Sequence, residues 1–371
     1  MRIGILTSSR ADYSIYYPLL VQLKKDSNFN FDIIAFGSHI SQEIDNSLCK
    51  IIEDGFDIKY KINTNPLSDQ AVAISESMGE TIKRFSQIWQ NDKYDLIFCL
   101  GDRYEMFAAV SSTVPFNLNI AHIHGGEETL GAIDNKFRHS ITHMSKYHFT
   151  TTELYKRRVI ELVQESNYVY NVGSLSYDNV KNLTLLTMSE FKLKFNIDLS
   201  VPTILITFHP ETVSIDQNEF FINELIDALQ CIKNLQFVFT MPNSDPESNI
   251  IRTKITDFVK SNTNAIAVEN FGTIGYLTCM KYCKLMLGNT SSGFAEAAYF
   301  PKPVINLGDR QKGRLVTPNI INCKITKKDI IDAVEIAFNQ PELEGSDMYG
   351  TGNSATRIIE VLYKIINKNS N

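Results

Sequence analysis

The residues best suited to chemistry in this chain gather between Asp102 and Arg138, where acids, histidines and glycines follow two apolar segments. The segment 96–100 runs into Gly-Asp-Arg, and the segment 118–122 runs into Ile-His-Gly-Gly-Glu. Ligands of open α/β sheets bind beyond the carboxyl ends of the strands. Polar groups at two consecutive strand ends therefore predict a catalytic site, and an enzyme is the first hypothesis.

Three carboxylates of this segment, Asp102, Glu127 and Asp134, form the first candidate catalytic group. Acids that lie close together repel, which raises the pKa of at least one of them, so protonated and ionised carboxyls coexist near neutral pH. Such a cluster suits the removal and return of a proton bound to carbon. Taken singly, Asp102 and Asp134 stand where helices are predicted to begin and could serve only as helix caps.

Five of the seven histidines lie between His122 and His148. His122 and His124 would point to one side of a strand end, and His139 and His143 would share a helix face. Together with a neighbouring acid they could hold zinc, which makes a metal-dependent hydrolase the rival hypothesis. No established metal-ligand motif covers this set, so we expect a site without metal or cofactor.

A second group of small polar residues, Gly-Asn-Thr-Ser-Ser-Gly, occupies positions 288–293 and is followed by Glu296. The run lies between a short apolar segment and a helical pattern, so N–H groups, hydroxyls and a helix N-terminus could face a diphosphate. Glu296 could accept hydrogen bonds from ribose hydroxyls. A simple capped turn would need only one of these residues, so their density favours ligand binding.

Cationic or titratable residues at other strand ends could complete such an anion site. Arg10 follows the first apolar segment and could donate two hydrogen bonds to a phosphate. Alternatively, its side chain could be solvated while a neighbouring residue caps the next helix. Arg310 and Arg314 lie in a cation-rich loop behind another predicted strand. His209 follows the strand at 203–207 and is a candidate acid or phosphate partner.

Length and composition limit the class of protein. A chain of 371 residues exceeds the usual size of a single core, so two domains are expected. The net charge of −6 argues against a broadly basic nucleic-acid surface, and no stretch is apolar for long enough to span a bilayer. The six scattered cysteines lack the short spacings of a zinc site. We therefore expect a cytoplasmic protein without nucleic-acid or membrane partners.

Apolar runs alternate with amphipathic stretches in both halves of the chain, and this alternation predicts the strands. The expected strands are 3–7, 31–36, 96–100, 118–122, 148–151 and 168–172, then 203–207, 237–240, 265–268, 285–287 and 304–307. The pattern predicts an α/β protein with two Rossmann-like doubly wound domains, 1–180 and 181–353, and a ligand cleft between them. The packing of the last helix, within 354–371, stays open. The Gly-x-Gly-x-x-Gly and Walker motifs are absent, which argues against a dehydrogenase or a nucleotide triphosphatase.

Taken together, these residues resemble the hydrolysing UDP-N-acetylglucosamine 2-epimerases of the sialic acid pathway type. The motifs that carry the likeness are Arg-Ala-Asp-Tyr-Ser from position 10, Gly-Ser-His from 37, Leu-Gly-Asp-Arg-Tyr-Glu from 100, His-Ile-His-Gly-Gly-Glu from 122, Ile-Asp from 133, Arg-His from 138, His-Pro from 209 and Gly-Asn-Thr-Ser-Ser-Gly from 288. The likeness spans nearly the whole chain. It implies the B-type glycosyltransferase fold, a UDP-sugar substrate bound between two Rossmann-like domains, and a homodimer or homotetramer.

The resemblance also implies roles for single residues. The residues implied to be catalytic are Asp102, His124, Glu127, Asp134, Arg138 and His209. The residues implied to bind the substrate and its UDP part are Arg10, His39, Arg103, Asn243, Thr290, Ser291, Ser292, Glu296, Arg310 and Arg314. Where many relatives have a third acid, in a His-Ile-Glu-Gly-Gly pattern, this chain has His124, so either His124 or Glu127 takes over its part in proton handling.

The implied reaction removes the C2 proton as UDP leaves C1, which gives a 2-acetamidoglucal; water then adds at C1 and a proton returns to C2 on the other face. The products are UDP and N-acetylmannosamine. Relatives on the same framework act on UDP- or GDP-linked 2,4-diacetamido-2,4,6-trideoxy sugars in legionaminic acid pathways. A nucleotide-sugar sensor without activity is a further alternative. The chemistry requires neither a metal nor a nicotinamide.

Overall fold

The computed structural model describes residues 1–40, 47–242, 247–341 and 343–369. Contacts within the chain divide it into two units, each with its own sheet. Unit 1 comprises Met1–Glu127, Asp134–Lys181 and Tyr349–Asn371, and unit 2 comprises Glu128–Ile133 and Asn182–Met348. The short segment 128–133 thus belongs to unit 2, although it is embedded in the sequence of unit 1.

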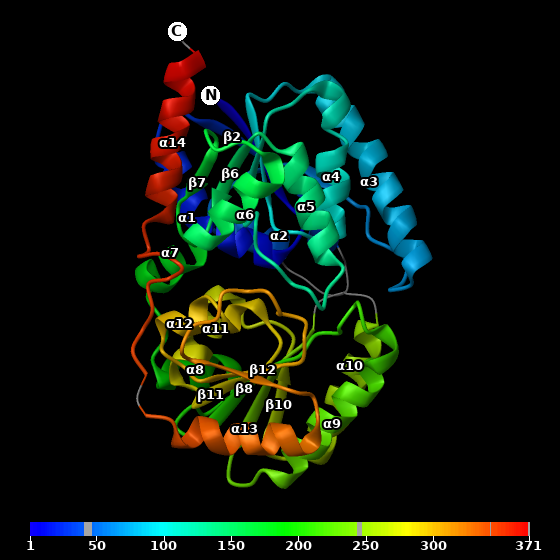
Figure 1. The fold of residues 1–371 in the computed structure, drawn as a ribbon, viewed down its shortest axis with the longest axis vertical. Helices are drawn as coiled ribbons and strands as arrows, with labels where there is room; N and C mark the ends of the chain where they lie inside the picture. The colour runs from blue at the N-terminus through cyan, green and yellow to red at the C-terminus, as the bar shows by residue number, and fades with distance from the viewer. Residues whose placement is uncertain (41–46, 243–246, 342, 370–371) are drawn as a thin grey trace. The chain divides into compact units, whose positions relative to one another are not determined.

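Unit 1 is built on a seven-stranded sheet with the order β3-β2-β1-β4-β5-β6-β7 (Figure 1). Its strands are β1 (Arg2–Thr7), β2 (Asn30–Phe36), β3 (Ile58–Ile62), β4 (Leu96–Leu100), β5 (Ile120–Ile123), β6 (Tyr147–Thr150) and β7 (Val169–Asn171). All neighbouring strands pair in parallel. The strand order reverses between β1 and β4, and the carboxyl ends of such a pair mark the usual ligand site of an open sheet.

Helices cover both faces of this sheet. They are α1 (Arg10–Lys25), α2 (Ser47–Glu53), α3 (Ala71–Asn91), α4 (Tyr104–Ser111), α5 (Asp134–Met144), α6 (Glu153–Val163), α7 (Leu175–Asn182) and α14 (Ser354–Asn369). Leu96, Phe98 and Leu100 of β4 join a core with α1 and α14. Ile97 and Cys99 join a second core with α3, α4 and α5. Because both faces are covered, β4 is apolar along its whole length.

The last helix, α14, packs in unit 1 against α1, which answers the question that the sequence left open. Ala355, Ile358 and Leu362 enter the core that lies under α1. Asp178 caps the start of α14, because its carboxylate accepts hydrogen bonds from the N–H groups of Ser354 and Ala355 at 2.9 and 2.8 Å. The chain therefore returns to unit 1 after completing unit 2.

Unit 2 has a six-stranded parallel sheet with the order β10-β9-β8-β11-β12-β13. The strands are β8 (Thr203–Thr207), β9 (Gln236–Thr240), β10 (Ala265–Val268), β11 (Leu285–Gly288), β12 (Val304–Leu307) and β13 (Ile320–Cys323). The helices are α8 (Met188–Phe195), α9 (Asn218–Cys231), α10 (Ser248–Ser261), α11 (Gly272–Tyr282), α12 (Glu296–Tyr299) and α13 (Lys327–Asn339). Its strand order reverses between β8 and β11.

The two units thus confirm the predicted pair of Rossmann-like doubly wound sheets. The edge strands β3 and β13 are additions to the expected set. In the part of the chain that the structure describes, no helix is long and apolar enough to cross a membrane.

Candidate active site

The turn after β1 is held by buried side chains. The carboxylate of Asp12 accepts hydrogen bonds from the N–H and the Oγ of Ser8, at 2.8 and 2.7 Å, and burial raises the pKa of Asp12. His39, at the end of β2, contacts Thr7 Oγ1 through Nε2 at 2.8 Å. Burial lowers the pKa of His39 to about 4, so its ring is neutral at pH 7. His39 therefore shapes the turn that presents Arg10, the first residue of α1.

Arg103 lies between β4 and α4 and is oriented by a buried acid. Its Nε and Nη2 donate to the two carboxylate oxygens of Glu105, at 3.2 and 3.1 Å. Glu105 is buried in the first turn of α4. A bidentate pair of this kind fixes the plane of the guanidinium, so Arg103 occupies a defined position at the carboxyl edge of the sheet.

Arg138 of α5 connects the ends of two strands. Its side chain is only 1 % exposed, and its Nη2 forms an ion pair with the carboxylate of Asp102, which follows β4. Its Nη1 donates to the carbonyl of Glu127, after β5, at 2.9 Å and to Asn135 Oδ1 at 2.7 Å. The structure therefore brings together three residues that the sequence marked as catalytic, namely Asp102, Glu127 and Arg138.

His124 and Glu127 form a second contact in the same loop. His124 has a left-handed backbone, with a φ of 69°, and its N–H donates to the carbonyl of Phe149 at 3.1 Å. Its Nδ1 lies 3.6 Å from Glu127 Oε1, which also accepts a hydrogen bond from Thr151 Oγ1 at 3.3 Å. His124 Nε2 is buried and has no hydrogen-bond partner among the described residues. One ring nitrogen thus faces a carboxylate, and the other has no hydrogen-bond partner among the described residues.

His122, in contrast, is a structural residue. Its Nδ1 contacts Thr142 Oγ1 at 3.1 Å and its Nε2 contacts the carbonyl of Gly101 at 2.8 Å. Burial, reinforced by neighbouring histidines, lowers its pKa to about 3. Both ring nitrogens are used within the protein, so the zinc set considered from the sequence loses its first member. Among the described residues, no three His, Cys, Asp or Glu side chains come together as a group that could hold a metal ion.

Asp134 is the first residue of α5 and is half-buried. A carboxylate at this position is stabilised by the N-terminal end of the helix dipole. Arg138 follows four residues later, so the two side chains lie on one face of the helix. Unit 1 therefore supplies Asp134 from the same helix that carries the buried guanidinium.

In unit 2, a buried amide joins the ends of β8 and β11. Asn289 is fully buried; its Oδ1 accepts the N–H of His209 at 2.7 Å and its Nδ2 donates to the carbonyl of His209 at 2.8 Å. A Cβ at the preceding Gly288 would lie 1.9 Å from the carbonyl oxygen of Thr207, so only glycine allows this approach. Sequence reasoning missed Asn289, although it stands inside the Gly-Asn-Thr-Ser-Ser-Gly motif.

The hydroxyls of that motif follow β11 directly. Ser292 Oγ contacts the hydroxyl of Tyr276 at 2.5 Å and Thr290 Oγ1 at 3.2 Å. Ser291 begins a short 3₁₀ turn, and Glu296 is the first residue of α12. The motif therefore presents small polar groups beyond the carboxyl end of β11, at the point where the strand order of unit 2 reverses.

The loop after β12 carries Arg310 and Arg314 and is tied to the loop after β8. Arg310 Nε donates to the carbonyl of Pro210 at 3.3 Å. Arg314 Nε donates to Gln311 Oε1 at 2.5 Å, and Gln311 Nε2 donates to the carbonyl of Asn289 at 2.8 Å. These bonds connect the predicted cations to the hydroxyl motif, and Gln311 is a second residue that the sequence analysis missed.

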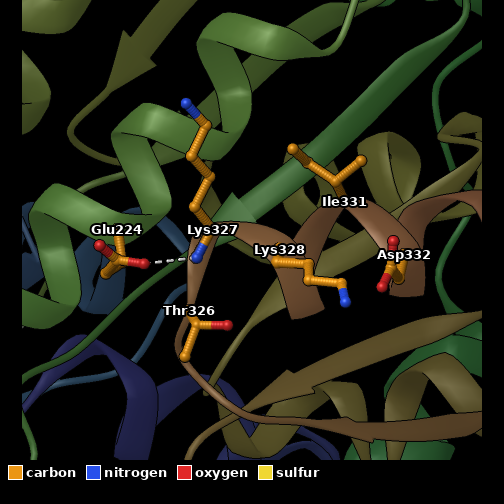
Figure 2. A pocket seen from close by; sticks show the side chains of 6 residues that line it. All are labelled: Glu224, Thr326, Lys327, Lys328, Ile331 and Asp332. Carbon is orange, nitrogen blue, oxygen red and sulfur yellow. Dashed lines mark hydrogen bonds between the residues drawn. The ribbon is translucent and has the colours of Figure 1, made fainter.

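Asn243, also predicted to bind substrate, lies outside the described residues. A pocket elsewhere in unit 2 lies at the start of α13 (Figure 2). There Glu224 Oε2 accepts the N–H of Lys327, so a carboxylate of the protein already occupies this helix terminus. The pocket shares no residue with the candidate site, and we assign it no role.

The sequence of the chain is similar to those of known proteins along most of its length. The family model described as UDP-N-acetylglucosamine 2-epimerase matches residues 21–363. The chain is 36 % identical over 329 residues to the GDP/UDP-N,N'-diacetylbacillosamine 2-epimerase (hydrolyzing) of Campylobacter jejuni, which covers 88 % of this chain and 85 % of that protein. It is 34 % identical to the polysialic acid biosynthesis protein P7 of Escherichia coli, over 99 % of this chain and 95 % of that protein.

Solved structures show the same fold. The UDP-GlcNAc 2-epimerase of Neisseria meningitidis, solved bound to UDP-GlcNAc, aligns with a TM-score of 0.80 over 98 % of this chain and all of that chain, at 19 % identity. With its two parallel-sheet α/β units, the chain has the B-type glycosyltransferase fold that the resemblance implied.

Proposed function

The chain belongs to the UDP-N-acetylglucosamine 2-epimerase family, and from that premise we propose that it is a hydrolysing 2-epimerase that converts UDP-N-acetylglucosamine into UDP and N-acetylmannosamine. The observation that carries the proposal is the cluster at the ends of β4 and β5, where buried Arg138 pairs with Asp102 and binds the carbonyl of Glu127. A relative that is 36 % identical bears the word "hydrolyzing" in its name, which supports the release of free sugar.

The difficult step is removal of the C2 proton, because no carbonyl stands next to that carbon to stabilise the charge. A base must act while the C1–O bond to UDP breaks, and the diphosphate must be stabilised as it departs. We assign the proton transfers at C2 to Asp102, Asp134 and His124. Glu127 Oε1 lies 3.6 Å from Nδ1 of His124, and we assign the proton transfer to Nε2, which has no hydrogen-bond partner among the described residues.

In this assignment unit 2 binds the leaving group. Thr290, Ser291 and Ser292 offer hydroxyls and N–H groups to the diphosphate, and Glu296 accepts from the ribose hydroxyls. Arg310, Arg314 and His209 supply cationic or donor groups from the loops that Asn289 and Gln311 hold together. Arg10 of unit 1 contributes a further guanidinium.

The test is incubation of the protein with UDP-N-acetylglucosamine in deuterated water, with UDP release and deuterium at C2 followed together by NMR. We expect N-acetylmannosamine that carries deuterium at C2, because the returning proton comes from solvent through a titratable side chain. Release of UDP without label at C2 would contradict the elimination route. Binding of the sugar nucleotide without any turnover would favour a sensor.

A second candidate substrate class is a UDP- or GDP-linked 2,4-diacetamido-2,4,6-trideoxyglucose. The observation that favours it is the name of the Campylobacter relative, a diacetylbacillosamine 2-epimerase. The reaction at C1 and C2 would be the same, and only the substituents at C4 and C6 differ. Parallel measurement of kcat/KM on both sugar classes discriminates between them, and the larger value identifies the substrate.

A further inference from the structure

The segment Glu128–Ile133, which we name the strap, joins two candidate catalytic acids. Glu127 precedes it and Asp134 follows it, and both of these residues belong to unit 1. The strap itself belongs to unit 2 by its contacts. The chain therefore leaves unit 1 directly after one acid and returns to it directly before the other.

Three hydrogen bonds donated by backbone N–H groups fix the strap within unit 2. The N–H of Leu130 donates to the carbonyl of Lys312 at 2.9 Å, and the N–H of Gly131 donates to the carbonyl of Asp309 at 3.1 Å. The N–H of Ile133 donates to Thr212 Oγ1 at 2.9 Å. These bonds end on the loops that follow β12 and β8, which also carry Arg310 and His209.

The contact between the strap and the loop after β12 leaves no space for a side chain at either of its two glycines. A Cβ at Gly131 would lie 2.5 Å from both the carbonyl carbon and the carbonyl oxygen of Asp309. A Cβ at Gly313, which has a φ of 97°, would lie 2.7 Å from the Cβ of Glu128. Backbone therefore packs on backbone at Gly131 and on the side chain of Glu128 at Gly313, so a displacement of one segment must move the other.

The loop after β12 is in turn connected to the hydroxyl motif. Glu211 Oε1 accepts the N–H groups of Asp309 and Arg310 at 2.7 and 3.2 Å, so one buried carboxylate holds the turn on which Gly131 rests. Gln311 of the same turn donates to the carbonyl of Asn289. The start of the motif is thus connected to the strap by two hydrogen bonds that meet in the turn 309–311.

We propose that the strap is a positioning element: a nucleoside diphosphate bound at the loop after β12 sets, through the strap, the positions of Glu127 and Asp134. The proposal rests on the function proposed above and adds a coupling between the leaving-group site and the acids. The strap is six residues long and is fixed by three of its N–H groups, so it has little slack to absorb movement of the loop. The acids then reach their working positions when the leaving group is bound.

The decisive variant is Gly131→Ala, because the added methyl group separates the strap from Asp309. Gly131 does not have a positive φ, so alanine suits its backbone and the effect comes from the contact alone. Gly79→Ala is the matched control, since Gly79 is exposed in α3 and a Cβ there meets nothing within 4 Å. Thr212→Val is a milder variant that removes only the acceptor of the Ile133 N–H.

We expect Gly131→Ala to lose far more in kcat than in UDP affinity: kcat should fall about 100-fold, the loss typical of a catalytic group displaced by about 1 Å. Thr212→Val should lose less, and Gly79→Ala should match the unaltered protein. Amide hydrogen exchange adds a second measurement, whose response to UDP would not change if the strap had only a structural role. UDP should protect the first-turn amides of α5, residues 135–138, in the unaltered protein but not in Gly131→Ala.

Two results would overturn the coupling. One is UDP binding to the unaltered protein without any change of exchange in α5. The other is a normal kcat and a normal exchange response in the strap variants, with Thr212→Val deciding if Gly131→Ala does not fold. If the unaltered protein does not bind UDP at all, both the proposed function and the coupling are wrong. This outcome differs from the two above, which contradict the coupling alone.

Discussion

The carboxyl ends of the strands in unit 1 and in unit 2 share one topology but carry different chemistry. In unit 1 they hold ionisable groups, such as Asp102 paired with buried Arg138 and His124 beside Glu127. In unit 2 they are organised by a neutral amide, Asn289, and by hydroxyls such as Ser292. We therefore expect the same reversal of strand order to serve proton transfer in one unit and anion binding in the other, because the fold supplies the location and the side chains supply the chemistry.

The contrast between the two units would fail most clearly if an acid of unit 1 were not needed for activity. We expect Asp102→Asn and Asp134→Asn each to abolish UDP release, a loss of about 10³-fold or more in kcat, since proton transfer by a positioned side chain contributes about 10²–10⁴-fold. UDP affinity, measured by calorimetry, should change little because we assign nucleotide binding to unit 2. Turnover near that of the unaltered protein in both variants would exclude the carboxylate mechanism.

The role of His124 can be tested by two replacements, the first of which is chosen to suit its left-handed backbone. Asparagine tolerates a positive φ and has no basic nitrogen, so we expect His124→Asn to keep the fold and lose about 100-fold in kcat. His124→Glu should recover part of this loss, because a carboxylate can also move the proton. Full activity of His124→Asn, with a large loss in Glu127→Gln, would assign the proton to Glu127 instead.

The neutral network of unit 2 should matter for stability and for nucleotide binding. Asn289→Ala removes the two hydrogen bonds that the amide makes to the N–H and carbonyl of His209, which we expect to cost about 2–3 kcal/mol in the free energy of unfolding. UDP affinity should fall as well, because the hydroxyl motif is no longer held. Urea denaturation and calorimetry measure both effects, and an unchanged midpoint would show that the amide is not needed.

A further expected effect, on stability and not on turnover, concerns acid sensitivity, because six of the seven histidines lie in unit 1. Burial lowers the pKa of His39 and of His148 to about 4, while an unfolded histidine titrates near 6.5. Between these values the unfolded state binds more protons, so stability falls as the pH is lowered from about 6.5 towards 4, by about 1.4 kcal/mol per pH unit for each histidine.

Hydrogen exchange at pH 7 and pH 5 should therefore show unit 1 loosening before unit 2. His39→Gln keeps a donor for Thr7 but removes one titration, so it should reduce the pH dependence of the stability of unit 1. Raised pKa values of the buried acids Asp12 and Asp178 act in the opposite direction and are unchanged in that variant. Equal pH dependence of the two units would contradict the assignment.

Much of the fold could be predicted because local patterns of apolar residues determine most strands and helices. The strand at 96–100 is apolar throughout and agrees with β4, since both faces of a parallel sheet are covered. The strands β3 and β13 escaped prediction for the converse reason. They lie at the sheet edges and are only partly buried, so Lys and Tyr in β3 and Asn in β13 interrupt the apolar signal.

The candidate site could be predicted where charge marks it. Asp102 and Arg138 stood out as ionisable groups at expected strand and helix ends, and the structure pairs them. Asn289, Glu211 and Gln311 did not stand out, because their function is to bind backbone groups that lie far away in the sequence. The substrate roles of single residues, the place of Asn243 and the homodimer or homotetramer stay predictions.

By itself the sequence determined most of the strands and helices and the chemical types at the strand ends, because these depend on residues within a few positions of one another. Only the tertiary structure decided that α14 joins unit 1, that His122 is structural while His124 keeps a free nitrogen, and that the strap belongs to unit 2. Each of these depends on contacts between segments far apart in the chain. Such contacts are selected by packing and hydrogen-bond satisfaction over the whole molecule, which no local pattern encodes.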